Sequence, residues 1–344
     1  MPKKKLDIEE DELPFVPEVE VTGVYPTLVR KRTGLFSLDF ALSSQGYLGL
    51  PLRTIVELSG REGVGKSTLA YYIAGKVSDP KSLISVCDIE LLDTKYVKSA
   101  TGIAGFKGTV HLIDGVDDKG NMRHHEKMLW DMVKELSDNK TGASVLDSIS
   151  ALQPVVEQEV LNEKNGEFGQ AFMGKRAKMV GQVARALSGV LRNRESPSVA
   201  LIVNHVYPNL GSPGFSTAGG VVKDAEKAVS LRLWVGEYFG DDNNRPIGFL
   251  VKGHVDKLRF GGKGGEFQFY IVPGLGVHPG VSAMFDCFDL GLAERGARVK
   301  LHDRSLGFLK ADLLTYAAQG KTRKFLPFLE EVDKHAEKVK RGEV

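Results

Sequence analysis

Residues 60–67 read GREGVGKS and match the pattern GxxxxGK[ST] without a gap. The apolar run Arg53–Ser59 precedes this segment, and the pattern of Thr68–Val77 after it is typical of a helix. A glycine-rich turn between a strand and a helix lets successive backbone N–H groups point into one concavity, where the positive end of the helix also lies. Because such a turn binds phosphate groups, the chain is predicted to bind a nucleoside triphosphate.

The residues of this loop are expected to have different roles in nucleotide binding. Lys66 is expected to reach the β- and γ-phosphates, and the Ser67 hydroxyl to take one coordination place on Mg²⁺. The nucleotide contacts are predicted at Gly60, Arg61, Glu62, Gly63, Val64, Gly65, Lys66, Ser67 and Thr68.

Apolar runs alternate with helical patterns along the chain, which predicts an α/β fold with a mainly parallel central sheet flanked by helices. Strands are expected at 53–59, 82–87, 109–113, 143–146 and 199–203, and helices at 68–77, 121–136 and 174–194. Three later runs, at 229–235, 247–251 and 267–271, are interpreted as strands that extend the sheet.

Charge and proline content suggest three regions. The first 20 residues carry seven acidic residues against three lysines and include two prolines in the segment LPFVP, so residues 1–32 are expected to form an N-terminal arm that serves oligomerisation. Residues 33–277 would form the nucleotide-binding core. Residues 278–344 would form a small basic α/β or helical domain, because twelve Lys/Arg face seven Asp/Glu from Arg295 onward.

Composition excludes several classes of protein. No apolar run reaches the roughly 18 residues of a membrane span, and no apolar segment follows the lysines at the start, so a soluble, cytoplasmic protein without membrane partners is expected. Cys87 and Cys287 are the two cysteines and lack CxxC spacing, which argues against a disulfide scaffold or a zinc knuckle.

A phosphate loop of this type needs carboxylates from neighbouring strands. Asp147 ends the predicted strand 143–146 and is the candidate second metal ligand. Hydrolysis also needs a group that orients the attacking water, and both Asp88 and Glu90 follow the strand 82–87. At the carboxyl edge of a parallel sheet either residue would serve, so the residues alone leave both open.

Segments on both sides of the loop resemble the RecA family. Residues 33–39 read TGLFSLD and residues 49–57 read GLPLRTIVE, which are similar to the family's lead-in, and residues 147–154, DSISALQP, are similar to the stretch after its strand-end aspartate. The resemblance covers most of the chain, from about Thr33 to Arg304. It implies a RecA-type core that uses ATP with Mg²⁺. It also implies that Glu90 is the catalytic glutamate, since the family's glutamate lies 24 residues beyond the loop lysine, and that Asp93 and Tyr96 hold the adenine.

A basic helix is expected next to this core. Residues 171–194 contain six Lys/Arg and no acidic residue, and Lys175, Lys178, Arg185 and Arg192 fall on one helical face opposite an apolar one. Such a stripe suits a phosphate backbone, although a solvated basic face is the alternative. By resemblance to the first DNA-binding loop and the helix after it, DNA contacts are predicted at Met173, Gly174, Lys175, Arg176, Lys178 and Arg185.

His205 stands where the family usually has a glutamine that senses the γ-phosphate. A histidine here resembles the phage UvsX-type branch, and its imidazole can still donate to a phosphate oxygen. The segment 206–220 that follows is uncharged, is rich in glycine and proline, and ends in the pair Gly219 and Gly220. It resembles the family's second DNA-binding loop, which DNA orders.

A further pair of cations lies downstream. Residues 255–261 read VDKLRFG and resemble the family's K-x-K/R pair, which implies that Lys257 and Arg259 act on the ATP of the neighbouring subunit. The alternative register, Lys252 with His254, stays open.

The resemblance therefore implies an ATP-dependent recombinase that forms a helical filament on single-stranded DNA and exchanges strands with homologous double-stranded DNA in recombination and repair. Further partners would be single-strand-binding and mediator proteins, in a bacterial cell or a phage-infected host. Two alternatives stand beside it: a RadA-like branch-migration ATPase, whose zinc ribbon and protease-like domain this sequence does not show, and a nucleotide-gated DNA-binding mediator.

Overall fold

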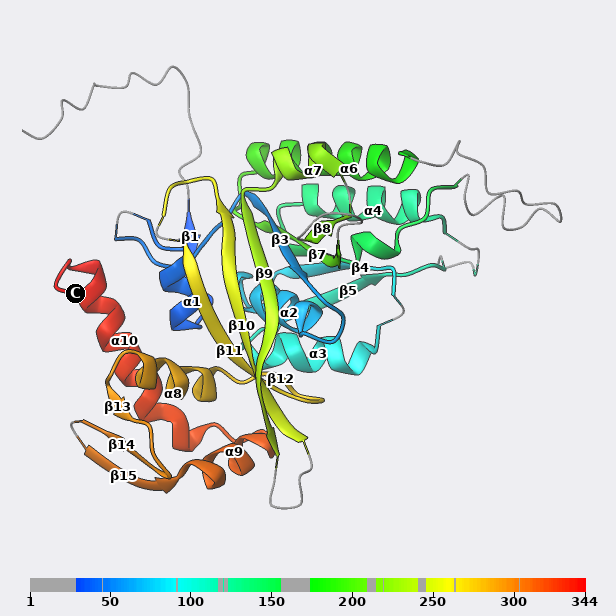
Figure 1. Ribbon diagram of the computed structural model, residues 1–344. Helices are drawn as coiled ribbons and strands as arrows, with labels where there is room; N and C mark the ends of the chain where they lie inside the picture. Colours follow the sequence, from blue (N-terminus) through cyan, green and yellow to red (C-terminus); the bar gives the residue numbers. More distant parts are fainter. Residues whose placement is uncertain are drawn as a thin grey trace, which may run out of the picture.

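The computed structural model describes residues 29–44, 46–90, 92–116, 120, 123–155, 174–208, 215–218, 220–240, 246–262, 264–302 and 304–344. Within them the largest element is a ten-stranded sheet in the order β12-β11-β10-β9-β3-β7-β6-β4-β5, with β8 paired to β7 (Figure 1). The predicted α/β fold is confirmed.

The parallel part of the sheet contains six strands, and antiparallel strands extend it. The parallel strands are β3 (Thr54–Gly60), β4 (Leu83–Asp88), β5 (Thr109–Ile113), β6 (Thr141–Asp147), β7 (Val199–Pro208) and β9 (Val229–Gly240). The others are β8 (Phe215–Thr217), β10 (Pro246–Leu258), β11 (Gly265–Val272) and β12 (Gly276–Val277). The links from β9 to β12 are too short for a parallel crossover, and these strands therefore pair antiparallel.

Helices cover both faces of the parallel part (Figure 1). The helices α2 (Lys66–Val77) and α3 (Thr94–Ile103) lie on one face, and α4 (His125–Ser137) and α6 (Lys175–Asn193) on the other, beside the short α7 (Gly220–Glu226). Strand β7 is apolar at consecutive positions because Val199, Leu201 and Val203 pack toward α2, while Ala200 and Ile202 pack toward α4 and α6.

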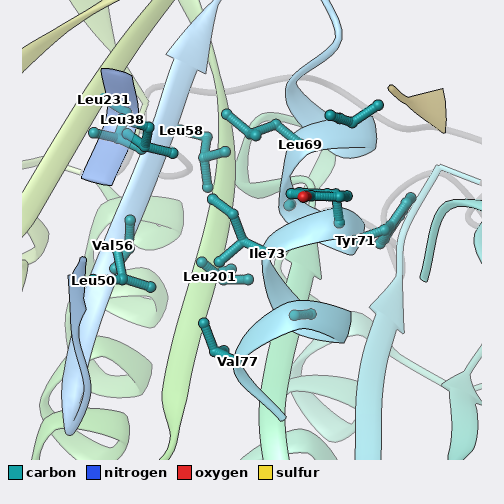
Figure 2. Close-up of a cluster of buried hydrophobic side chains, with 14 of the residues drawn as sticks. Leu38, Leu50, Val56, Leu58, Leu69, Tyr71, Ile73, Val77, Leu201 and Leu231 are labelled. Atoms are coloured by element: carbon teal, nitrogen blue, oxygen red, sulfur yellow. The ribbon is translucent and has the colours of Figure 1, made fainter. Parts of the chain in front are cut away.

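The core around α2 follows from helical spacing. Leu69, Ile73 and Val77 recur every four residues and face the sheet, where they meet side chains such as Leu58 and Leu201 (Figure 2). This packing fixes the axis of α2, so the amino end of the helix stays in place behind the phosphate loop.

The C-terminal region contains both helices and strands. It comprises α8 (Pro279–Asp289), β13 (Ala293–Glu294), β14 (Arg298–Leu301), β15 (Arg304–Leu309), α9 (Lys310–Ala318) and α10 (Leu326–Lys340), and its three strands form a separate small sheet. Its hydrophobic cluster also includes Leu250, Tyr270 and Val272 of the large sheet. The division of the chain at residue 278 stays a proposal, as does the arm at 1–32, most of which lies outside the described residues.

The elements at the start of the described chain are small. Strands β1 (Arg30–Lys31) and β2 (Leu50–Pro51) pair antiparallel, with α1 (Phe36–Ala41) between them. None of the helices that the structure describes is long and apolar enough to cross a membrane.

Several element boundaries differ from the predicted ones. The helix expected from residue 121 begins at His125, and β9 and β10 each run at least five residues beyond the predicted ends. Helix α3, of which Val97, Ala100 and Thr101 are buried, was not predicted.

Candidate functional site: the carboxyl edge of the parallel sheet

The register of the parallel strands brings the predicted site residues to one edge. Gly60 at the end of β3 pairs with His205 in β7, and Asp88 at the end of β4 pairs with Asp147 at the end of β6. Glu90 follows Asp88 by two residues. All these positions lie at the carboxyl ends of neighbouring parallel strands, where ligands bind in folds of this type.

The phosphate loop adopts a backbone that only glycine tolerates well. Gly63 and Gly65 have φ of 73° and 89°, in the left-handed region. A Cβ on Gly65 would stand 2.3 Å from Cδ1 of Ile271, so a side chain there would also collide with β11. Helix α2 begins directly after Gly65 at Lys66. The loop therefore forms a cradle at a helix amino end, which fits a polyphosphate.

Lys66 lies over this loop. Its Nζ donates to the carbonyl oxygen of Arg61 at 2.7 Å. Burial lowers the pKa of Lys66, while Asp147 and Glu90 act to raise it. The ammonium thus stands between the loop and two carboxylates.

Asp147 has the features of a metal ligand. It is fully buried, and its Oδ1 has no hydrogen-bond partner among the residues that the structure describes. Burial raises the pKa of Asp147, whereas Tyr71 and Ser67 act to lower it. A buried carboxylate oxygen left without a partner, beside the Ser67 hydroxyl, is an oxygen donor set that fits Mg²⁺.

Glu90 lies in a small polar cluster. The Ser148 hydroxyl donates to Glu90 Oε1, and Ser150 Oγ lies 2.8 Å from Ser148 Oγ. His205 Nε2 lies 3.6 Å from the same Glu90 oxygen. Burial lowers the pKa of His205, and so does Lys66, which favours the neutral imidazole. The γ-phosphate sensor and the catalytic base predicted from the sequence are therefore neighbours.

Asp88, the other candidate for the water-orienting group, is placed differently. It is buried, and its Oδ2 accepts a hydrogen bond from the backbone N–H of Leu92 at 2.9 Å. This contact shapes the chain after β4. The arrangement favours Glu90 as the residue that faces a ligand.

The predicted adenine residues follow the same edge. Asp93 caps α3 by accepting a hydrogen bond from Lys95 N at 2.9 Å. Tyr96 Oη lies 2.5 Å from Thr68 Oγ1 on α2. Tyr96 is thus held one residue beyond the Ser67 position, whereas the Asp93 carboxylate is used in the helix cap.

The two candidate cation pairs lie at different positions along strand β10. Lys257 pairs with Ser230, which pairs with Glu57, so Lys257 lies two strands from β3 and more than about 10 Å from Gly60. Lys257 Nζ donates to the carbonyl of Asp224 at 2.6 Å, and Arg259 donates to the carbonyl of Ala225. Neither cation reaches the phosphate loop of its own chain.

Along the strand direction, Lys252 and His254 lie closer to the phosphate loop than Lys257 and Arg259 do. Lys252 pairs with Trp234, the residue after the one that pairs with Gly60. His254 Nδ1 lies 3.0 Å from Asp256 Oδ1. Both pairs thus make contacts within their own chain, and the choice between them stays open.

Helix α6 has the predicted two faces. Lys178, Arg185 and Arg192 are exposed at intervals of seven residues, and Val180, Val183 and Leu187 are buried against the sheet. Arg176 lies outside this stripe, and its guanidinium donates to the carbonyl oxygen of Ser150 at 3.3 Å. Lys175 and Gly174 lie at the amino end of the helix.

The two predicted DNA loops are only partly described. Met173 and Gly219 lie outside the described residues, as do most of the first loop and part of the second. Gly220 is the first residue of α7. The structure therefore places the end of the first loop at α6 and the end of the second loop at α7.

Sequence reasoning missed several polar residues that join these parts. Ser148 donates to Glu90 and also contacts Ser150. Tyr71 donates to Asp147, and Asn204 donates to Glu57 Oε1 at 2.7 Å inside the sheet. For two of them, their place in the sequence indicated that they lie near the site, because Ser148 directly follows Asp147 and Asn204 directly precedes His205.

Comparison with known proteins agrees with this geometry. The RecA N-terminal domain family matches residues 27–223. Protein RecA of Geobacter sulfurreducens is 28% identical over 283 residues, covering 79% of this chain and 73% of the relative. Protein RecA of Syntrophus aciditrophicus is 30% identical over 276 residues, covering 77% and 70%, and that of Campylobacter jejuni subsp. doylei is 27% identical over 296 residues, covering 80% and 76%. The matched region contains the phosphate loop, the carboxyl edge and the basic helix, and the chain therefore belongs to the RecA family of ATP-dependent recombinases.

Proposed function

We propose that this chain hydrolyses ATP in a DNA-dependent manner, forms filaments on single-stranded DNA and promotes pairing with homologous duplex DNA in recombination and repair. The observation that carries the proposal is the meeting of Lys66, Glu90 and Asp147 at one sheet edge, next to a helix with a basic face. In a bacterial cell or a phage-infected host this work is cytoplasmic.

The site residues have complementary roles in hydrolysis. The Glu90 carboxylate takes a proton from a water molecule as the water oxygen bonds to the γ-phosphorus and the bridging bond to the β-phosphate breaks. Lys66 offsets charge on the phosphate oxygens, and Ser67 with Asp147 would hold Mg²⁺. When bound, Mg²⁺ supplies positive charge against the phosphates.

A chain of contacts links this site to the basic helix. Glu90 is held by Ser148, Ser148 contacts Ser150, and the carbonyl of Ser150 accepts from Arg176 on α6. A change in the position of Glu90 would therefore be felt at the amino end of α6, where the first DNA loop ends. We infer that nucleotide state and DNA affinity are coupled along this path.

The alternative functions are not favoured. The relatives reported above are named Protein RecA and match across most of the chain, which supports a recombinase over a RadA-like motor. A nucleotide-gated mediator would not need a water-orienting glutamate, and the position of Glu90 at the carboxyl edge, 3.6 Å from His205, supports an ATPase instead.

The deciding experiment measures ATP turnover with and without single-stranded DNA, followed by pairing of homologous strands. Stimulation of turnover by DNA and formation of joint molecules are expected. Turnover that ignores DNA, with no joint molecules, would refute the recombinase proposal.

Removing the basic stripe should weaken DNA binding in a salt-dependent way. In the double variant Lys178→Ala with Arg185→Ala, two phosphate contacts are lost, and the slope of log K against log salt should fall by about 1.4 for single strands. The measurement is fluorescence anisotropy of a labelled oligonucleotide at several salt concentrations. Lys334→Ala with Lys338→Ala on α10 removes the same charge elsewhere and is the control. Equal slopes for the two double variants would mean that the stripe is only a solvated face.

A shared active site can be tested by mixing variants. Lys257→Ala and Lys66→Ala chains should each be inactive alone, because every subunit interface in a filament of one variant lacks one of the two required lysines. In a mixture, an interface that combines the intact loop of the first variant with the intact Lys257 of the second should hydrolyse ATP. Turnover that does not recover in any mixing ratio would argue against a cation supplied by the neighbouring subunit.

A further inference from the structure

Tyr71 makes an unusual contact for a core residue. It is fully buried in α2, and its Oη donates to Asp147 Oδ2 at 2.5 Å. Figure 2 shows its ring among the buried hydrophobic side chains of the α2 layer. Packing alone would be served by phenylalanine, because a buried hydroxyl costs free energy unless it is paired. The partner of this hydroxyl is the carboxylate at the end of β6.

Helical spacing places Tyr71 beside the metal-ligand serine. Ser67 and Tyr71 are four residues apart in α2, so both side chains leave the helix on the same side, one turn from each other. Both act on the same carboxylate, since Ser67 and Tyr71 each lower the pKa of Asp147. The two oxygens of Asp147 are thereby distinguished: Oδ2 is engaged by Tyr71, and Oδ1 has no hydrogen-bond partner within the described chain.

We propose that Tyr71 is a positioning residue of the metal site, which holds Asp147 Oδ2 so that Oδ1 faces the coordination place beside Ser67. This inference rests on the proposed function of Ser67 and Asp147. Without the hydrogen bond, the carboxylate can rotate about its last bond, and its like-charged neighbours Glu90 and Asp88, which both act on Asp147, would influence where it settles.

The effect of such an outer contact is measurable. Groups that orient a metal-ligating carboxylate typically change metal affinity or activity about 10- to 100-fold when they are removed. Tyr71→Phe keeps the ring and the packing, and removes only the hydroxyl. The expected result is a metal affinity about 10- to 100-fold weaker in the presence of ADP, with unchanged affinity for ADP in EDTA.

The experiment uses the full chain and Mn²⁺ as the probe. Free Mn²⁺ is followed by electron paramagnetic resonance during titration with and without ADP, and binding of a fluorescent ADP is measured in EDTA. Tyr72→Phe is the matched control, because Tyr72 is the adjacent buried tyrosine and the carboxylate that acts on it is Asp39. Thermal unfolding of both variants shows that each is folded.

The possible outcomes distinguish the positioning role of Tyr71 from failure of the metal site itself. Weaker Mn²⁺ binding in Tyr71→Phe alone supports the positioning role, and equal Mn²⁺ affinity in the two variants overturns it. If the wild-type chain with ADP binds no Mn²⁺, the proposed metal site fails and Tyr71 fails with it. In an Asp147→Asn background, Tyr71→Phe should cause no further loss; a full additional loss would show that Tyr71 acts elsewhere.

Discussion

Lys66→Ala is expected to abolish ATP turnover, with a fall of at least about 100-fold, both with and without DNA. The ammonium stands at the amino end of α2, where phosphate oxygens meet the loop N–H groups, and alanine leaves their charge uncompensated. The measurement is steady-state phosphate release at saturating ATP and DNA.

Lys76→Ala is the matched control for this prediction. Lys76 is the other lysine of α2, lies in its last turn and is exposed, so its loss changes the same charge far from the loop. Turnover by Lys76→Ala should equal that of the wild type. A Lys66→Ala chain that still turns over ATP at more than about a tenth of the wild-type rate would contradict the role given to the loop.

Glu57→Ala is expected to lower the free energy of unfolding by about 3–5 kcal/mol. Glu57 is buried in β3, where it accepts hydrogen bonds from the ammonium groups of Lys223 and Lys227. Burial acts to raise the pKa of Glu57, but the two lysines outweigh it and hold that pKa below its usual value. Alanine would leave the two cations with only Asp224, whose side chain is half exposed, as a counter-ion.

Urea denaturation of the chain without nucleotide measures this loss. Asp79→Ala is the control, because Asp79 pairs with Lys31 at 2.7 Å but its side chain is 81% exposed, and exposed pairs contribute only about 0–1 kcal/mol. Replacing Glu57, Lys223 and Lys227 together with methionine should recover most of the stability. Equal midpoints for Glu57→Ala and Asp79→Ala would refute the prediction.

The ion pairs of Glu57 with Lys223 and Lys227 also determine how the stability of the fold changes with pH. Because the pKa of Glu57 is lower in the folded chain than in the unfolded one, its contribution is present above the unfolded pKa. The contribution is lost as the pH falls through the folded pKa. The stability difference between wild type and Glu57→Ala should therefore shrink in acid.

The same network reaches the segment before α7. Lys223 Nζ and Asn204 Nδ2 both donate to the carbonyl of Ala218, at 2.8 and 2.9 Å. Asn204 directly precedes His205, so one buried cluster joins the strand of the predicted γ-phosphate sensor to the end of the second predicted DNA loop. Loss of Glu57 is expected to loosen this end as well as destabilise the fold.

Features whose chemistry lies in residues close together in the chain could be predicted from the amino-acid sequence. The phosphate loop is eight consecutive residues, the amphipathic face of α6 follows a period of 3.6, and apolar runs mark the strands, so each could be predicted without distant contacts. The position of Asp147 at the end of a predicted strand made it the candidate metal ligand, and the resemblance to the RecA family then assigned roles to Glu90 and His205.

Contacts between residues far apart in the chain, in contrast, are visible only in the folded protein. The contacts of Tyr71 with Asp147, of Ser148 with Glu90 and of Glu57 with Lys223 join residues separated by 76, 58 and 166 positions. Strand register also separated Lys257 from its own phosphate loop. No periodic pattern encodes such pairs, because parallel strands are neighbours only after crossover helices have folded between them, and the packing of those helices sets the register.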